Sequence, residues 1–379
     1  MIFFLLSATL ALSFLLGWLI IPHIVRLAMR LHLYDQPDAR KVHKKPIPRI
    51  GGVSFLPIAT VTLAMVLVPY LRLDPLHAGL WSNMQAGHLL AYLCGALLIY
   101  VIGLYDDLYT ASYRIKFVVQ IVAASLLCVS GLWVANFSNV FYIREVPYWL
   151  GMPFTVFFVV YVTNAMNLID GIDGLSSGLS IITLVIMAGL NVVAGDQIWA
   201  FMSIAFAGVL CAFFVYNVFS WRNKIFMGDA GSLSLGYTLA FLVLHFWQRD
   251  PVWNPLFHNV GLVALSPLVI PLLDVVRVFF VRLLHRRNPF LPDKNHIHHL
   301  LLDAGFSARN TLVLILAFSL VIIVINCLVA DFISQTIMLI NDIFLYSILV
   351  LTALYLKKDK LNKAYDDYYY DDNAPGKEQ

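Results

Sequence analysis

The chain has 379 residues, of which 60% are hydrophobic and 12% are charged, and its mean hydropathy is +0.81. This composition excludes a water-soluble globule, because it leaves too little polar surface to face water on all sides. The net charge of +3 comes from basic residues that lie next to apolar runs rather than in one separate stripe, so we expect no nucleic-acid partner.

Eleven apolar runs come close to the roughly 20 residues that a helix needs to cross the hydrocarbon layer. They predict an all-α polytopic membrane protein that contacts membrane lipid. No repeat and no soluble insertion interrupts them, so we expect one domain, residues 1–356, and a charged, disordered tail, residues 357–379. The runs are 2–21, 50–70, 88–105, 115–134, 150–166, 175–194, 198–219, 231–247, 259–284, 312–330 and 336–356.

The Lys and Arg residues indicate the orientation of these runs. All but three of the 25 lie on one side of the predicted membrane, the exceptions being Arg72, Arg144 and Arg249. By the positive-inside rule, the N-terminus is outside and the C-terminus is cytoplasmic. The first run is followed, not preceded, by basic residues, which is the reverse of a cleavable signal, so we expect it to remain.

The first cytoplasmic loop is basic and ends in two glycines. Lys44 and Arg49 are among its basic residues, and Gly51 and Gly52 follow at once. One interpretation is an anchor on lipid headgroups. The other is a phosphate-binding lip, which the paired glycines favour because they let backbone come close to a ligand.

Two adjacent carboxylates, Asp106 and Asp107, end the third run. They repel each other, and acids at the C-terminus of a helix oppose its dipole. Their position is unfavourable unless a base, a metal or a ligand compensates. Arg114 and Lys116, at the start of the next run, are the nearest bases along the chain.

The segment 164–174 ends the fifth run with polar side chains at every third position. Asn164, Asn167, Asp170 and Asp173 share one helical face, and Gly171 permits a turn. Such groups are costly in hydrocarbon unless they face a polar cavity. Their oxygens suit Mg2+ or Mn2+ rather than zinc. The alternative is that they satisfy one another between helices.

Two further polar segments lie on the same side. Asp229 follows Phe226 in a turn of small residues before the eighth run, where it is either an ordinary helix cap or part of a phosphate cradle. A long loop after the ninth run is rich in imidazoles and guanidiniums. Because no cysteine or spaced carboxylate completes a zinc set, this loop favours a diphosphate or a sugar. Its candidate residues are Arg282, His296, His298 and His299.

Acids that can hold a divalent cation, together with bases that can hold phosphates, are the parts of a phosphoryl-transfer site. No P-loop motif is present in the sequence. A transporter also uses intramembrane acids, but those acids should lie near the midplane, whereas these lie at one face. A non-catalytic scaffold would not require several acidic motifs on one side.

Four motifs together resemble the polyprenyl-phosphate N-acetylhexosamine-1-phosphate transferases, glycosyltransferase family 4. They are Asp106 and Asp107 with Lys116, the segment 164–175, the turn 226–232 and the histidines of 296–299, and the resemblance runs from about residue 30 to 310. It implies a bacterial inner-membrane enzyme with its active site on the cytoplasmic face. Such an enzyme uses Mg2+ to transfer a sugar 1-phosphate from a UDP-N-acetylhexosamine to undecaprenyl phosphate, and it releases UMP. This reaction is the first membrane step in making a cell-envelope polysaccharide, such as an O-antigen or a teichoic acid linkage. The resemblance leaves open whether the protein forms a homodimer.

The resemblance also implies residue roles. Asp106, beside Asp107, resembles the acid proposed to take a proton from the lipid phosphate, and Asn167 and Asp229 resemble the metal-linked pair. Lys116 would hold the lipid phosphate, with Arg114 as the alternative because the spacing from Asp107 is wide. The other implied substrate-binding residues are Lys44, Arg49, Asn164, the uridine turn of Asp170, Gly171 and Asp173, the stacking ring of Phe226, and the diphosphate-facing Arg282, His296, His298 and His299.

The histidine loop points to a branch within the family. Residues 292–299 look like the bacterial branch that acts on UDP-GlcNAc, and they lack the three consecutive histidines of the branch that acts on UDP-MurNAc-pentapeptide. Other UDP-amino sugars stay open as donors. The segment between Asn217 and Phe226 is longer than the family pattern and lacks its proline, which leaves the role of Asn217 open.

Overall fold

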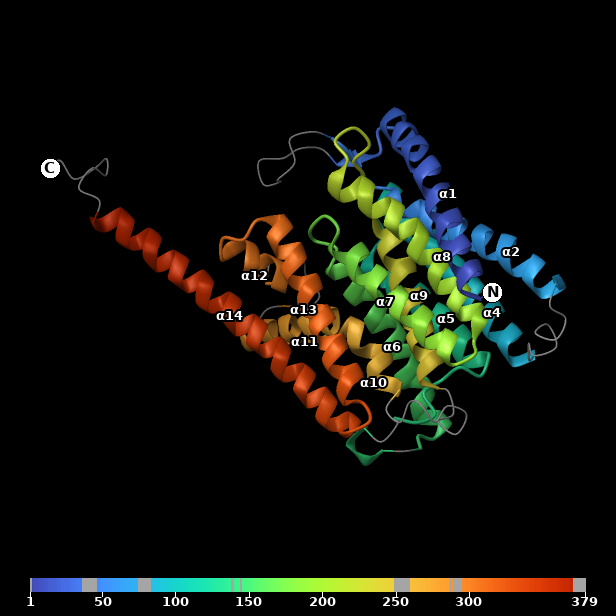
Figure 1. Ribbon diagram of the computed structural model, residues 1–379. Coiled ribbons are helices and arrows are strands. Elements are labelled where there is room, and N and C mark those ends of the chain that lie inside the picture. Colours follow the sequence, from blue (N-terminus) through green and yellow to red (C-terminus); the bar gives the residue numbers. More distant parts are fainter. Residues whose placement is uncertain are drawn as a thin grey trace.

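A computed structural model describes residues 2–35, 46–73, 83–137, 140–143, 145–248, 260–286, 288 and 295–370. Helices dominate this part of the chain (Figure 1). The α-helices are α1 (Ile2–Arg30), α2 (Phe55–Leu73), α4 (Asn83–Tyr109), α5 (Tyr113–Val129), α6 (Tyr148–Leu168), α7 (Leu175–Val193), α8 (Gln197–Phe214), α9 (Asp229–Trp247), α10 (Val260–Leu265), α11 (Val269–Leu284), α12 (Ile297–Asp303), α13 (Ala308–Val329) and α14 (Gln335–Tyr370).

Short elements join them. They are the 3-10 turns η1 (Gly51–Ser54), η2 (Val140–Tyr142) and η5 (Ser266–Leu268), the π-helical turn η3 (Val215–Phe219), and the strands β1 (Tyr34–Asp35) and β2 (Ile47–Pro48). The two strands pair antiparallel, with Tyr34 opposite Pro48.

Ten helical segments of the described chain are long and apolar enough to cross a membrane, which confirms the predicted all-α polytopic class. The one predicted crossing without such a segment is the fourth, 115–134, which corresponds to α5, a helix of only 17 residues. Its first turn contacts the end of α4 through Lys116 and Asp106, whereas Cys128 near its end contacts Met152 at the start of α6. α5 therefore carries the chain from one end of the bundle to the other.

The predicted ninth crossing is a broken helix. It consists of α10, the 3-10 turn η5 and α11, and Pro267 and Pro271 lie at the break. Proline lacks an amide hydrogen and clashes with the preceding turn, so the regular helical hydrogen bonds cannot continue through this segment.

Helix α9 forms the centre of the bundle. Its residues from Ala230 to Phe246 are all buried, and α4, α6, α7 and α10 pack around it. Glycines allow the closest approaches: Gly236 lies against Thr163 of α6, and Gly103 of α4 lies against Ala230. The first residue of this central helix is Asp229, so packing fixes the position of that carboxylate.

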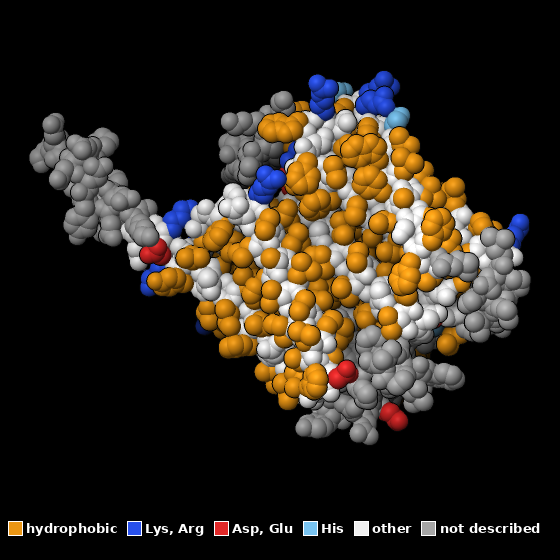
Figure 2. Space-filling view, viewed as in Figure 1, with side chains coloured by type: hydrophobic (Ala, Val, Ile, Leu, Met, Phe, Trp, Pro, Cys, Tyr) orange, Lys and Arg blue, Asp and Glu red, His pale blue; other side chains and the backbone are white. Residues whose placement is uncertain are grey.

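The outside of the bundle is apolar. In the view of Figure 2, hydrophobic side chains cover the middle of the molecule, and Lys and Arg side chains gather mainly along the upper edge and near the projecting end of α14. Helix α14 continues to Tyr370, well past residue 356, the predicted end of the domain. Lys357 Nζ lies 2.8 Å from Asp303 Oδ2, so the start of the predicted tail is helical and contacts α12; residues 371–379 lie outside the described chain.

Candidate active site

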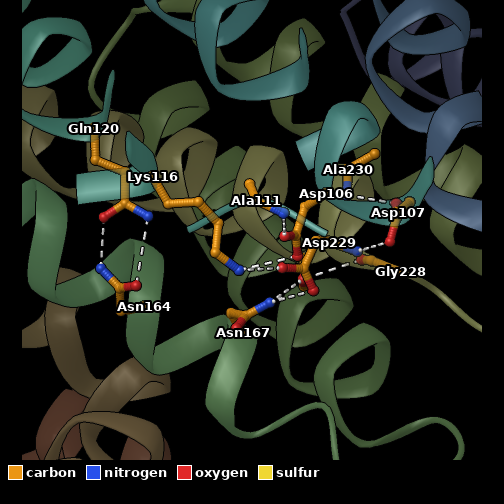
Figure 3. A network of polar contacts seen from close by, with 11 residues as sticks. Asp106, Asp107, Ala111, Lys116, Gln120, Asn164, Asn167, Gly228, Asp229 and Ala230 are labelled. Atoms are coloured by element: carbon orange, nitrogen blue, oxygen red, sulfur yellow. Dashed lines mark hydrogen bonds and ion pairs between the residues drawn. The ribbon is translucent and has the colours of Figure 1, made fainter. Parts of the chain in front are cut away.

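Three charged side chains from three different helices meet where α4, α5 and α9 come together (Figure 3). Lys116 Nζ lies 3.0 Å from Asp106 Oδ2 and 2.8 Å from Asp229 Oδ2. All three side chains are partly buried, so water screens these ion pairs less than it screens pairs on an open surface. The structure thus brings together three of the residues proposed from the sequence.

The structure distinguishes Lys116 from Arg114, the alternative candidate for a phosphate ligand. Arg114 is exposed, with Nε 3.2 Å from the hydroxyl of Tyr113 and its guanidinium over the same ring. Because only Lys116 faces the two carboxylates, it is the better candidate for a phosphate ligand at this site.

The two amides of α6 make different contacts. Asn167 Nδ2 lies 3.1 Å from Asp229 Oδ1 and donates to Ser232 Oγ at 2.8 Å. Asn164 pairs with the buried Gln120 of α5, donating to Oε1 at 2.6 Å. Asn167 is therefore part of the carboxylate cluster, whereas Asn164 links two helices one turn away from it.

Asp107 has a different environment from Asp106. Its Oδ1 accepts the amide hydrogen of Asp229 at 2.7 Å, and its Oδ2 accepts that of Ala230 at 2.9 Å. These amides belong to the first turn of α9, which lacks intrahelical acceptors. Asp107 thus caps the central helix from α4, and the catalytic role that the sequence suggested for it stays a prediction.

Glycines make this junction possible. Gly228, which precedes α9, has φ +74°, in the left-handed region that favours glycine, and a Cβ there would overlap the carbonyl of Arg49. A Cβ on Gly103 would lie 2.6 Å from Ala230 Cα. The carboxylates of α4 reach the start of α9 only because these positions lack side chains.

The first loop docks on the same turn through its backbone. Phe226 N donates to Pro48 O at 2.8 Å, Gly51 N donates to Phe226 O at 2.9 Å, and Gly52 N donates to Met227 O at 2.7 Å. The paired glycines thus approach protein backbone here. The Arg49 side chain is more than half exposed and lies 3.6 Å from Asp35, and Lys44 lies outside the described residues.

Asn217 connects the loop between α6 and α7 to the loop that precedes α9. Its Oδ1 accepts the amide hydrogen of Gly174 at 2.6 Å, and its Nδ2 donates to Ile225 O at 2.8 Å. Asp173, in the same loop, pairs with Lys224 at 2.5 Å. The π-helical turn η3 at the end of α8 therefore lets Asn217 join two loops, which gives this residue a structural role.

The loop 169–174 also meets the histidine segment. A Cβ on Gly171 would overlap Nε2 of His298, so the ring packs directly on the loop backbone. His298 is 1% exposed, and neither ring nitrogen has a hydrogen-bond partner within the described chain. Burial, and then the neighbouring His299, lowers the pKa of His298 to about 3, so its ring is neutral at pH 7.

Asp170 is the second perturbed group of this loop. Burial raises its pKa to about 7, and the negative charges of Asp173, Asp229 and Asp107 add to the rise. At neutral pH, Asp170 is therefore about half protonated and can donate a hydrogen bond as well as accept one. His296 and Arg282 are buried, and Arg282 Nη1 lies 3.4 Å from Asn288 O.

Several residues that contribute to the site were not predicted from the sequence. Gln120 lies four residues after Lys116 on α5, and Ser232 lies three residues after Asp229 on α9, so helical spacing offered a signal for both. Lys224 gave no such signal, because its pairing with Asp173 depends on how two loops fold together.

The donor set fits a magnesium ion in its chemistry. Oxygens of Asp106 and Asp229 converge on one cationic group, the ammonium of Lys116, and Asn167 contributes an amide beside them. Among the described residues, no three His, Cys, Asp or Glu side chains form a ready-made metal cage. Mg2+ commonly takes only one or two carboxylates and completes its shell with water and substrate phosphates, so this smaller set is compatible with it.

The fold and the site define a multi-pass membrane protein with a carboxylate, amide and lysine cluster where its helices end. A family model described as glycosyl transferase family 4 matches residues 89–246, a range that begins within α4 and ends near the end of α9. A probable undecaprenyl-phosphate N-acetylglucosaminyl 1-phosphate transferase of Bacillus subtilis is 33% identical over 358 residues, 92% of each chain.

Two further relatives are undecaprenyl-phosphate alpha-N-acetylglucosaminyl 1-phosphate transferases. The protein of Yersinia pestis is 33% identical over 298 residues, 76% of this chain and 75% of the relative. That of Escherichia coli is 31% identical over 297 residues, 76% of this chain and 74% of the relative. The chain belongs to glycosyl transferase family 4, as the resemblance of its motifs predicted, and the family makes it a phospho-sugar transferase.

Proposed function

We propose that this protein transfers N-acetylglucosamine 1-phosphate from UDP-GlcNAc to undecaprenyl phosphate and releases UMP. The names of relatives that match over most of their length support the acceptor and the sugar. The observation that carries the proposal is the convergence of Asp106, Lys116 and Asp229 from three helices. In the reaction, an oxygen of the lipid phosphate forms a bond to the sugar-bearing phosphorus, and the bond from that phosphorus to the oxygen of UMP breaks.

Asp229 and Asn167 are the residues proposed to hold Mg2+, which would neutralise the diphosphate and the charge that develops on departing UMP. Asn167 Nδ2 lies 3.1 Å from Asp229 Oδ1, and packing of the central helix fixes the carboxylate. Asp107 keeps the start of α9 in place through its two hydrogen bonds to the backbone.

Lys116 and Asp106 are proposed to receive the lipid phosphate. A phosphate that approaches the cluster attracts the ammonium of Lys116, and this attraction frees the Oδ2 atom of Asp106 that Lys116 now contacts at 3.0 Å. The freed carboxylate oxygen can then keep the phosphate deprotonated for attack. The bilayer supplies proximity, because it confines the lipid nucleophile to the plane of the site.

The loop 169–174 and the histidines are proposed to bind the nucleotide sugar. Asp170, with a pKa of about 7, can pair with both donors and acceptors of a uracil ring. The neutral, unpartnered ring of His298 lies against Gly171 of the same loop. We infer that this site faces the cytoplasm from a bacterial inner membrane, because it lies on the side where the Lys and Arg residues are concentrated.

Asp229→Asn tests the assignment most directly. We expect this variant, purified in detergent, to lose Mg2+-dependent UMP release from UDP-GlcNAc by more than a hundredfold, because it removes the carboxylate charge at the proposed metal. Asp331→Asn is the matched control, because Asp331 is an exposed carboxylate that follows α13. Near-normal activity of Asp229→Asn would refute the proposed site.

A donor panel tests the choice of sugar. The purified protein is incubated with undecaprenyl phosphate and, in separate reactions, with UDP-GlcNAc, UDP-GalNAc or UDP-MurNAc-pentapeptide. The mass of each lipid product is then measured by mass spectrometry. We expect a product that carries one N-acetylhexosamine phosphate from UDP-GlcNAc and none from the pentapeptide donor. A product from the pentapeptide donor alone would overturn the choice.

A further inference from the structure

A fully buried carboxylate contacts the histidine segment and lies outside the carboxylate cluster of Asp106 and Asp229. Asp274 of α11 is 0% exposed and accepts four hydrogen bonds. Oδ2 accepts from His296 Nδ1 at 2.8 Å. Oδ1 accepts from Ile297 N at 3.0 Å, Arg277 Nη2 at 2.8 Å and the Tyr346 hydroxyl at 2.8 Å.

This arrangement joins three elements that the sequence separates. Asp274 and Arg277 belong to α11, Ile297 begins α12, and Tyr346 belongs to α14. A buried charge is costly unless it is paired and its hydrogen bonds are satisfied, and here both conditions are met. Two of the four donors, His296 and Ile297, stand at the start of α12, so we expect removal of the charge on Asp274 to loosen the packing of this helix.

Asp274 replaces a missing cap at the start of α12. The residue before this helix, His296, makes no side-chain capping bond to it, and Ile297 is its first residue. The first amide groups of a helix lack intrahelical acceptors, and a negative charge near them is favourable. Because α12 has only seven residues, the carboxylate of α11 fixes the position of the whole short helix.

The same carboxylate orients a ring. Because Asp274 holds Nδ1 of His296, the ring cannot rotate freely. Its other nitrogen, Nε2, is then the polar atom that can contact a second partner. The rings of His296 and His298 are nearly parallel, with centroids 5.9 Å apart. His298 in turn packs on Gly171, so the contacts run from Asp274 to the loop proposed to bind the nucleotide.

We propose that Asp274 is a positioning residue for the nucleotide-sugar site, which holds His296 and the start of α12 against loop 169–174. The inference rests on the proposed function, because the ligand of that loop is the UDP-sugar. Asp274 cannot touch the substrate, since none of its surface is exposed. It acts through His296, in the way that an outer carboxylate fixes the ring of a ligand-binding histidine.

Asp274→Asn tests the proposal through the two Michaelis constants. We expect the KM for UDP-GlcNAc to rise about tenfold or more, the size typical when a partner that orients a histidine is lost. The KM for undecaprenyl phosphate should change less than twofold. Asp342→Asn is the matched control, because Asp342 of α14 is equally buried but pairs with Asn326 of α13 instead of the histidine segment. It should leave both constants unchanged, even if it lowers the melting temperature.

A double-mutant cycle separates positioning from general stability. If Asp274 acts through His296, the change Asp274→Asn should raise the KM for UDP-GlcNAc less than twofold in a His296→Ala background. Should Asp274→Asn fail to fold, Tyr346→Phe removes one of the four donors and should raise the same KM about threefold.

Four outcomes would count against these assignments in different ways. A full tenfold rise in the His296→Ala background, or equal rises in both Michaelis constants, would overturn the role of Asp274. An unchanged KM in an active, folded Asp274→Asn protein would do the same. Absence of UMP release by the wild-type protein would instead defeat the proposed function, and this inference with it.

Discussion

Lys116 is the side chain on which the charge balance of the site depends. Its ammonium lies within 3.0 Å of two carboxylates that would otherwise repel each other at the start of the central helix. A metal ion placed among the same oxygens has to share them with this ammonium. Lys116 and a divalent cation are therefore expected to compete for Asp229.

Lys116→Met tests this competition by metal binding rather than by activity. Without the ammonium, the two carboxylates should bind Mn2+ about tenfold more tightly in the absence of substrates, as measured by electron paramagnetic resonance. UMP release should fall at the same time, because the lipid phosphate loses its cation. Arg114→Met is the control and should change neither quantity. Weaker Mn2+ binding by Lys116→Met would show that the lysine does not compete.

The lowered pKa of His298 predicts how the stability of the protein depends on pH. Its pKa in the folded protein is about 3, below the ordinary value of 6.5, so the unfolded chain binds more protons between these values. The free energy of unfolding should therefore rise with pH in this window and fall as the pH drops below about 6.5. At pH 5 the loss from this one group is about 2 kcal/mol.

Melting temperatures of the detergent-solubilised protein at pH 7 and pH 5 check this prediction. The drop in melting temperature should be smaller in His298→Gln than in the wild-type protein, because the variant has no imidazole to protonate at this position. His23→Gln is the control, since His23 is not buried. Equal drops in wild type and His298→Gln would contradict the prediction.

At the scale of elements, the start of α9 is the most constrained point of the fold. Asp107 accepts its first amide hydrogens, Gly52 contacts Gly231, and Gly103 contacts Ala230. The apolar pattern shows that these helices exist. It does not show that α4 and α9 touch at their polar ends. That contact requires glycine at positions where any side chain would clash, and only the packed helices show which positions these are.

Gly103→Ala should separate these two helices. Its Cβ would lie 2.6 Å from Ala230 Cα, a contact that backbone must relieve, so we expect a melting temperature several degrees lower and at least a tenfold loss of UMP release. Gly87→Ala, in the same helix, has no atom within 4 Å of the added carbon and should be neutral or stabilising. If both variants behaved alike, the close contact of α4 and α9 would be wrong.

For the whole molecule, orientation and the role of α5 remain linked predictions. If the 17-residue helix α5 crosses the membrane, the chain crosses eleven times, with its N-terminus outside and its C-terminus in the cytoplasm. If α5 does not cross, every segment after it changes sides.

Alkaline phosphatase fusions distinguish these cases, because the enzyme is active only outside the cytoplasm. A fusion after Thr110, between α4 and α5, should be inactive, and one after Gly131, beyond α5, should be active. A fusion at the C-terminus should again be inactive. Activity after Thr110, or inactivity after Gly131, would refute the predicted orientation or the crossing by α5.

The sequence by itself determined the class of fold, the family and most of the candidate site. Long apolar runs are local signals, and every third position of segment 164–174 is polar, so helices and a polar face could be predicted without a partner in view. The motifs around Asp106, Asn167 and Asp229 identified the family because their residue types and order are also local.

Only the tertiary structure decided which polar groups meet. It paired Lys116, not Arg114, with the carboxylates, made Asp107 a cap of α9, paired Asn164 with Gln120, and connected Asp274 to the histidines. The separation of these partners in the sequence ranges from 10 residues, for Lys116 with Asp106, to 123 residues, for Asp107 with Ala230. Packing of helices selects such partners, and no local pattern encodes it.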